Sequence, residues 1–313
     1  MKKIKLYPGK LEISANYREN NILGRNLAYL SLANSDFTGR VENFVLKDED
    51  NLSYRDDLSK KISVFVPNSY DGTTPHDILY FFDAQNLFAN AGHYTDNGDP
   101  YGSWQLDIVI TALNRQYGKN IIVVGIDNAD MYRSQELFMN PDDFGCLSPL
   151  ATAIPGDDFS HGYLDNLSSF IVNTLHPFIK KTYCVKEDNI GLGGSSMGGI
   201  ASFYCGLKEQ GFYRYILSYS PAFGLYEASA FEDYFSKRKL ALDNDLPRIH
   251  IYCGMGDMLE EQLMPAAKSM KELLVKYGYS EDKIFETYDE EKPHNEESWR
   301  LVLPESFSLL LSL

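Results

Sequence analysis

Short apolar runs alternate with segments of helical periodicity in this 313-residue chain from about residue 75 onward. The apolar runs hold few polar residues, which is typical of strands that are covered on both faces. Alternation of this kind builds β-α-β units, so we expect an α/β fold whose mostly parallel central sheet has helices on both faces. The expected strands are 77–82, 120–126, 189–193, 215–219, 248–253 and 283–288, and the expected helices are 104–117, 164–182, 197–207, 259–277 and 295–311, the last kinked or broken at Pro304.

The N-terminal part of the chain has a different pattern. Residues 41–46 and 61–66 alternate apolar and polar side chains around a turn-rich stretch, which predicts antiparallel strands. We interpret residues 1–313 as a single domain in which residues 1–70 supply the antiparallel edge of the sheet. Residues 128–160 show no clear period and are rich in proline and glycine, so we expect long loops there.

Charge and cysteine usage exclude several classes of protein. The formal net charge of −15 repels phosphate backbones and anionic lipid, so we expect neither a nucleic-acid partner nor a membrane partner. The first residues lack the apolar core of a signal peptide, and the four cysteines are widely spaced with no C-x-x-C pair. Scattered thiols fit a reducing compartment, so we expect a cytoplasmic protein. No zinc-binding histidine spacing is present either, so we do not expect a zinc enzyme. The chemistry predicted below needs no metal and no organic cofactor.

The segment Gly194–Gly198 reads GSSMG and fits the pattern G-x-S-x-G between an expected strand and an expected helix. A nucleophile on such a sharp turn needs glycine two residues before and after it, because larger side chains would clash. The turn would present Ser196 and aim the Met197 backbone N–H and the helix N-terminus at the place where an oxyanion forms. A glycine-rich turn made for packing or for phosphate is the alternative, and the missing G-K-[ST] disfavours the phosphate version.

A serine nucleophile needs a base, and in α/β-hydrolases the base follows the serine in the chain. After Ser196 the chain holds only His250 and His294. His250 lies inside an expected strand, where a buried structural role is favoured. His294 lies in a loop between the last expected strand and the last expected helix, so we predict that His294 is the base.

The triad acid is expected after a strand that lies between the serine and the histidine. Asp257 follows the strand 248–253 through two glycines and can orient an imidazole from there. Glu260 and Glu261 are alternatives, but both fall in the first turn of an expected helix, where acids are common. We therefore predict Asp257, with Glu260 kept as the rival.

Further motifs run in order through the chain from about residue 40 to the C-terminus. They are YFFDAQNLF at 80–88, GSW at 102–104, VGIDN at 124–128 with Arg133, GSSMGG at 194–199, YSPAF at 219–223, CGMGD at 253–257, and HNE at 294–296 with Trp299. With these motifs the chain resembles the esterase D and enterochelin-esterase-like branch of the α/β-hydrolase fold. That branch includes feruloyl and tributyrin esterases and relatives of the antigen 85 acyltransferases.

The resemblance implies a Ser196–His294–Asp257 triad. It also implies an oxyanion hole made by the Met197 N–H and by a second backbone N–H just after the strand 77–82, for which Gln85 is our choice. The family usually has glycine at position 84, where this chain has alanine, and a methyl group there would narrow the loop.

Four further residues of these motifs are candidates for substrate binding: Trp104, Asp127, Asn128 and Arg133. The alternative for each residue is a structural role, either packing in the core, hydrogen bonding that holds a loop, or an ion pair.

We therefore predict a serine carboxylic-ester hydrolase that forms a covalent acyl-enzyme on short acyl, aryl or sugar esters. An acyltransferase with the same triad and a siderophore esterase are alternatives, and the net charge of −15 disfavours the anionic siderophore. A non-catalytic binding protein is less favoured, because all three triad positions are filled. The expected partner is a small-molecule ester, and homo-oligomerisation stays open.

Overall fold

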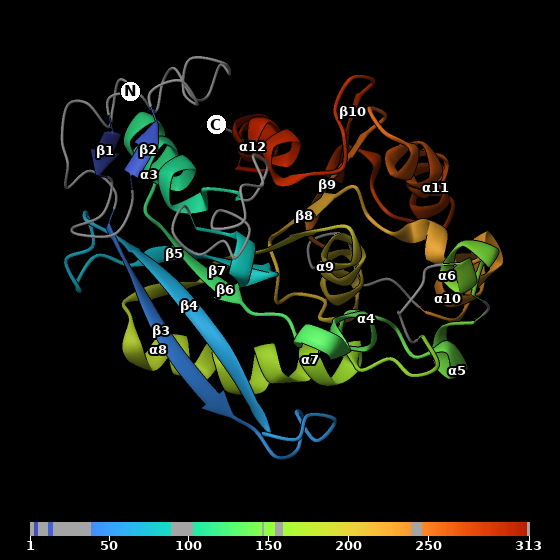
Figure 1. The fold of residues 1–313 in the computed structure, drawn as a ribbon, viewed down its shortest axis with the longest axis horizontal. Coiled ribbons are helices and arrows are strands. Elements are labelled where there is room, and N and C mark those ends of the chain that lie inside the picture. The colour runs from blue at the N-terminus through green and yellow to red at the C-terminus, as the bar shows by residue number, and fades with distance from the viewer. Residues whose placement is uncertain are drawn as a thin grey trace.

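The computed structural model describes residues 3–5, 12–14, 39–88, 103–145, 147–153, 159–238 and 246–311. Its main feature is an eight-stranded sheet with the strand order β10-β9-β8-β7-β5-β6-β4-β3 (Figure 1). The strands are β3 (Gly39–Lys47), β4 (Ser59–Pro67), β5 (His76–Phe82), β6 (Ile121–Ile126), β7 (Val185–Ser195), β8 (Tyr215–Tyr219), β9 (Arg248–Gly254) and β10 (Ile284–Asp289). The short strands β1 (Lys3–Lys5) and β2 (Glu12–Ser14) form a separate antiparallel pair.

The sheet has a parallel part and an antiparallel edge, as the sequence predicted. Strands β5 to β10 pair in parallel, whereas β4 is antiparallel both to β3 and to β6. Parallel strands end at the same side of a sheet, so the segments that follow β5, β7 and β9 meet along one edge. The candidate active site lies at that edge.

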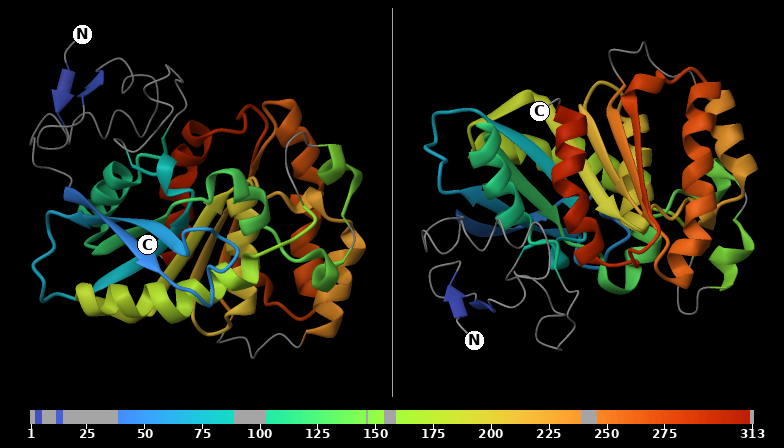
Figure 2. Two further views of the ribbon diagram at one scale, coloured as in Figure 1. Left: turned by 60° about the horizontal axis from the view of Figure 1, so that its bottom comes forward. Right: turned by 90° about the horizontal axis from the view of Figure 1, so that it is seen from above.

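Helices cover both faces of the sheet (Figure 2). The helices are α3 (Leu106–Tyr117), α7 (Leu164–Phe170), α8 (His176–Thr182), α9 (Met197–Lys208), α10 (Ala228–Lys237), α11 (Met258–Lys276) and α12 (Glu296–Leu311). In β5, Leu79 and Phe81 pack with α3 and α12, and Ile78 and Tyr80 pack with the helices of the other face. All four side chains are fully buried, which explains why the strand sequences do not alternate.

The structure differs from three expectations about helical segments. Residues 128–160 were expected to form long loops, but they contain the 3-10 helix η2 (Asp130–Tyr132) and the short helices α4 (Arg133–Glu136), α5 (Pro141–Phe144) and α6 (Pro149–Ala153). Helices of one turn are too short to leave a periodic pattern in a sequence. Pro304 lies inside α12, which continues past it as one helix rather than breaking.

The expected helix 164–182 is divided into α7 and α8 by a π-helical segment, η3 (Ile171–Leu175), which ends two residues before Pro177. A proline has no N–H to donate, and such a bulge accommodates the missing bond. Within the described residues no helix has the length and apolarity needed to cross a bilayer. Cys184, Cys205 and Cys253 are free thiols, and Cys146 falls outside the described residues.

Candidate active site

Ser196 occupies the turn between β7, which ends at Ser195, and α9, which begins at Met197. Its backbone has φ 57° and ψ −120°, a conformation that costs energy for any residue with a side chain. Neighbouring backbone groups hold it there: the Ser196 N–H donates to the carbonyl of Tyr219 at 2.9 Å, and its own carbonyl accepts from the N–H of Ala222 at 3.0 Å. This is the strained strand-to-helix turn that the sequence predicted for a nucleophile.

Close packing explains the glycines around Ser196. A Cβ atom on Gly194 would lie 2.4 Å from the carbonyl oxygen of Gly198, and one on Gly199 would lie 2.6 Å from that of Tyr219. Both distances are shorter than van der Waals contact, so a side chain at either position would push α9 away from β7 and β8. The glycines therefore allow α9 to lie close to β7 and β8.

The imidazole of His294 contacts Glu260. His294 follows β10 and precedes α12, and its Nδ1 lies 3.1 Å from Oε1 of Glu260 in the first turn of α11. The ring also packs edge-on against Trp299, with the ring centroids 4.9 Å apart. An imidazole whose Nδ1–H donates to a carboxylate has Nε2 left to accept a proton, which is the tautomer a general base needs.

Glu260 is fully buried, and four donors surround its carboxylate. Oε1 accepts from the hydroxyl of Ser220 and from the imidazole, and Oε2 accepts from the thiol of Cys253 at 3.0 Å and from the Gly254 N–H at 3.2 Å. A carboxylate has about four lone-pair sites, so this group is saturated with donors. A buried acid that is held so completely is well suited to fix the orientation of its partner.

Asp257, which the sequence analysis favoured as the triad acid, does not contact the imidazole. It caps the N-terminus of α11: Oδ1 accepts from the Glu260 N–H at 2.9 Å, and Oδ2 accepts from the backbone N–H of His294 at 2.7 Å. Burial would raise the pKa of Asp257, but these N–H donors hold it below its usual range. In this structure the rival Glu260, rather than the favoured Asp257, therefore takes the position beside the ring.

A second turn of the site follows β5. Asp83 has a left-handed backbone, with φ 59° and ψ 51°, and begins the 3-10 helix η1 (Ala84–Asn86). The N–H groups in the first turn of a helix have no partner inside that helix, and both predicted oxyanion donors, Gln85 and Met197, are first-turn residues. The Gln85 side chain fixes this turn, since its Nε2 donates to Asp83 and its Oε1 accepts from the Asn128 N–H, each at 3.4 Å.

Arg133 forms a forked ion pair with Asp83. Its Nε lies 2.7 Å from Oδ1 and its Nη2 lies 2.9 Å from Oδ2, while the amide of Asn128 donates to Oδ1 at 3.2 Å. Burial alone would raise the pKa of Asp83, but the Arg133 guanidinium holds it below its usual range. These contacts favour a structural role over substrate binding for Arg133 and Asn128, because both side chains hold the turn after β5.

The first turn of α12 is also linked to the turn after β5. Asn86 donates from Nδ2 to Oε1 of Glu296 at 3.1 Å, two residues beyond His294. Burial raises the pKa of Glu296 above its usual range. The turn after β5 and the segment after His294 are thus joined directly.

A family model named Esterase, with the description "Putative esterase", matches residues 57–310. The chain belongs to the Esterase family. This finding confirms the family resemblance. No curated protein matches this sequence.

Several solved structures share the fold of this chain. Enterobactin esterase FES from Shigella flexneri is similar with a TM-score of 0.60 and 16% identity over 88% of this chain, which spans only 62% of that longer protein. An IroE-like serine hydrolase from Shewanella oneidensis has a TM-score of 0.63 and 13% identity, with 87% of this chain and 80% of that chain covered. The ferulic acid esterase AmCE1/Fae1A from Anaeromyces mucronatus has a TM-score of 0.58 and 16% identity, with 86% and 89% covered. These structures confirm the α/β-hydrolase fold.

The remaining two candidates for substrate binding, Trp104 and Asp127, make contacts that hold the fold together. Trp104 is 1% exposed, and its ring packs against those of Phe81, Tyr219 and Trp299 at centroid distances of 4.8, 5.1 and 5.5 Å, so it is a core residue. Asp127 follows β6, and its N–H donates to the carbonyl of Lys61 on β4 at 3.2 Å.

Ala84, where the family usually has glycine, packs beside Gly125. A Cβ on Gly125 would lie only 2.8 Å from the Ala84 methyl group. The glycine in β6 thus leaves the room that the methyl group at position 84 occupies.

Ser220 is a residue of the site that sequence reasoning missed. It has φ 40°, donates to Glu260, and accepts from Trp299 Nε1 at 2.8 Å. It therefore connects the carboxylate to the tryptophan that packs on His294. The only sequence signal was its place in the YSPAF motif, which gave no role.

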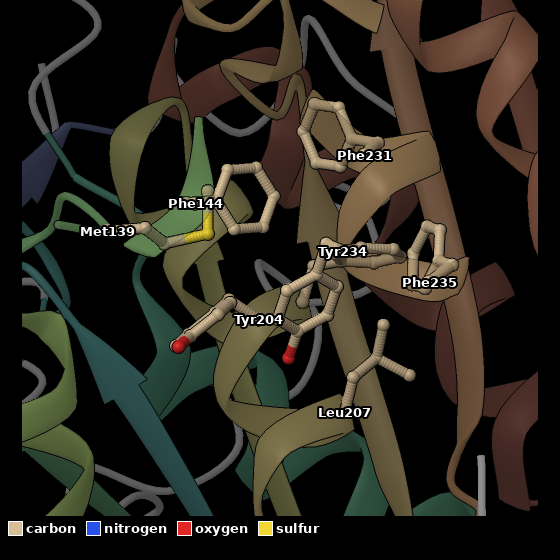
Figure 3. A pocket seen from close by; sticks show the side chains of 8 residues that line it. Met139, Phe144, Tyr204, Leu207, Phe231, Tyr234 and Phe235 are labelled. Carbon is tan, nitrogen blue, oxygen red and sulfur yellow. The ribbon is translucent and has the colours of Figure 1, made fainter. Parts of the chain in front are cut away.

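The pocket in Figure 3 is not part of this site. Its lining on α9 includes Tyr204 and Leu207, which lie in the second half of the helix, whereas Ser196 precedes the helix. At 1.5 Å per residue, Tyr204 is about 10 Å along the axis from the helix start. The aromatic side chains of α10 complete the pocket, so it belongs to the packing of α9 against α10. The lining residues are Met139, Phe144, Phe203, Tyr204, Leu207, Phe231, Tyr234 and Phe235.

Burial of His250 is expected to make the stability of the protein depend on pH. It is 1% exposed, its ring nitrogens contact the hydroxyls of Ser306 and Thr287 at 2.7 and 2.9 Å, and burial lowers its pKa from 6.5 to about 4. Between pH 6.5 and 4 the unfolded chain binds a proton at this residue that the folded chain does not bind. The contribution of His250 to the free energy of unfolding should therefore be greatest above pH 6.5 and should fall by about 3 kcal/mol as the pH drops to 4.

Urea unfolding of the wild type and of His250→Gln at several values between pH 5 and 7 measures this contribution. We expect the variant to show a shallower pH dependence over that interval. Equal slopes for the two proteins would contradict the assignment of this dependence to His250.

Proposed function

We propose that this esterase hydrolyses carboxylic esters through an acyl-enzyme on Ser196, with His294 as general base and Glu260 as the acid that orients it. Ser196 Oγ attacks the ester carbonyl carbon while His294 Nε2 takes the hydroxyl proton. The tetrahedral intermediate then expels the alcohol, which receives that proton. Water, activated by the same imidazole, releases the acid and restores the serine.

The observation that carries the proposal is the contact between His294 Nδ1 and the buried Glu260 carboxylate, 3.1 Å apart. A neutral imidazole can serve as a base only if its free nitrogen faces the nucleophile, and Glu260 selects that tautomer. Glu260 also stabilises the imidazolium that forms during the attack.

Backbone N–H groups of Met197 and Gln85 are the proposed donors to the oxyanion. They come from two turns that lie close together: a Cβ on Gly198, the residue after Met197, would be 3.1 Å from Asp83 Oδ2. A well-placed donor of this kind contributes about 3–4 kcal/mol to the stabilisation of the transition state.

The proposed substrates are neutral esters with short acyl, aryl or sugar groups. The net charge of −15 disfavours an anionic substrate through long-range repulsion. Arg133, a positive group at the turn after β5, is engaged by Asp83.

Partitioning of the acyl group tests the covalent route. Butyrate esters of p-nitrophenol, phenol and 4-methylumbelliferone are hydrolysed in a fixed concentration of methanol, and free butyrate and methyl butyrate are quantified. A common acyl-enzyme gives the same ratio of the two products from every ester, with butyrate as the main product for a hydrolase. A ratio that changes with the leaving group would contradict the acyl-enzyme, and a predominance of methyl butyrate would indicate a transferase.

A further inference from the structure

A buried cluster of charges lies outside the triad, between the antiparallel edge of the sheet and α4. Lys60 on β4 is 1% exposed and pairs through Nζ with Oε2 of Glu136, which is fully buried. The Tyr54 hydroxyl donates to Glu136 Oε1 at 2.7 Å, and Arg55 Nη1 lies 3.8 Å from the same oxygen. A buried ion pair adds little to stability compared with apolar packing, so its presence needs another reason.

The helix that carries Glu136 is also the helix that carries Arg133. Helix α4 has only four residues, from Arg133 to Glu136, and a single turn is not stable by itself. Its position therefore depends on contacts with the rest of the fold, among them a backbone hydrogen bond from the Tyr163 N–H to the Gln135 carbonyl and the ion pairs of its two end residues. Arg133 at its start pairs with Asp83, and Glu136 at its end pairs with Lys60.

Asp83 transmits the position of α4 to the oxyanion side of the site. It is the residue that begins η1, so its left-handed backbone directly precedes Ala84 and the N–H of Gln85. Arg133 is bonded to both carboxylate oxygens of Asp83, at 2.7 and 2.9 Å. A displacement of α4 would therefore move the turn, and displacements of about 1 Å are enough to weaken catalysis strongly.

We propose that Glu136 and Lys60 are positioning residues for the oxyanion turn: their buried ion pair fixes α4, so that Arg133 holds Asp83 and places the Gln85 N–H. The inference rests on the proposed function and extends it to the antiparallel edge of the sheet. Because the Gln85 N–H acts on the charge that develops in the transition state, a misplaced turn lowers kcat and leaves KM nearly unchanged.

Glu136→Gln tests this inference in the full chain. With p-nitrophenyl butyrate we expect kcat to fall about tenfold to a hundredfold while KM stays within about twofold. The reason is that part of the stabilisation of the oxyanion by the Gln85 N–H is lost. The inhibition constant of 1-butaneboronic acid, which forms a tetrahedral adduct on the serine, should rise in parallel with the fall in kcat. Lys60→Met should act in the same way, and the double variant should lose little more than either single variant, because both act through one contact.

Two controls separate positioning from loss of stability. Ile179→Ala creates a cavity at a fully buried position on α8 and should lower stability without changing kcat at a temperature where it is folded. If Glu136→Gln does not fold, Tyr54→Phe removes only the hydroxyl that donates to Glu136 and keeps the ring that stacks on Tyr163 at 4.5 Å. We expect Tyr54→Phe to lower kcat several-fold with an unchanged KM.

Wild-type kcat and wild-type boronate inhibition in folded Glu136→Gln, or in Tyr54→Phe if the former does not fold, would overturn the inference. A fall in kcat no larger than that of Ile179→Ala at equal loss of stability would do the same. Failure of the proposed function has a different signature, because the wild type would then lack Ser196-dependent hydrolysis.

Discussion

Replacing Ser196 with alanine is expected to lower kcat/KM for p-nitrophenyl butyrate by about 10⁵-fold or more, to near the rate that the oxyanion donors alone support. The hydroxyl is the atom that bonds to the acyl carbon, so no other group of the triad can compensate for its loss. The turn itself should keep its conformation, because backbone hydrogen bonds with Tyr219 and Ala222 hold its strained backbone.

The neighbouring serine supplies a matched control for this variant. Ser195 is the last residue of β7 and has a side chain of the same chemistry, so Ser195→Ala should retain activity within a few-fold of the wild type. Steady-state kinetics of both variants, purified in parallel, gives the comparison. Substantial hydrolysis by Ser196→Ala, or an equal loss in both variants, would contradict the role of Ser196 as nucleophile.

The second large effect is expected at Glu260. Glu260→Gln should lower kcat by about 10³–10⁴-fold, because an amide facing His294 Nδ1 favours the wrong tautomer of the ring. The shape of the side chain is conserved, so the effect reports the charge and the hydrogen bond. The thiol of Cys253 and the hydroxyl of Ser220 lose an ionised acceptor, and urea unfolding is measured beside the kinetics to account for this.

Asp257→Asn is the matched comparison for Glu260→Gln. Asn is also a good N-cap, but its amide can accept from only one of the two N–H groups that Asp257 now binds, from Glu260 and from His294. We expect a loss of about 1 kcal/mol of stability and activity above one tenth of the wild type. The opposite pattern, with a large loss in Asp257→Asn and a small one in Glu260→Gln, would show that Asp257 is the triad acid.

Local sequence was sufficient for the elements that place Ser196 and His294. The buried strand, the glycine pattern and the helix around Ser196 are contiguous in the chain. His250 was predicted to be structural for a similar reason, because it lies inside an expected strand. The parallel sheet was predictable for the same reason, because each strand and each helix carries its own pattern of buried side chains.

The acid was not predictable in this way, because two carboxylates share the start of α11. Asp257 follows a strand in the sequence, which is where a triad acid is expected. Its side chain instead caps the N-terminus of α11. Glu260 points back from the first turn to His294, a contact that depends on how the segment after β10 folds over β9. The ion pairs of α4 were equally hidden, since Lys60 and Glu136 lie 76 residues apart and α4 is one turn long.

Labelling with a fluorophosphonate tests the central claim, the Ser196–His294–Glu260 triad, most directly. The folded wild type, Glu260→Gln and Asp257→Asn are incubated with the probe, and the adducts are located by peptide mass spectrometry over time. The account predicts a single adduct on Ser196 that forms rapidly in the wild type and in Asp257→Asn, and far more slowly in Glu260→Gln. An adduct on another residue, no adduct on folded wild type, or equal rates in the wild type and Glu260→Gln would contradict it.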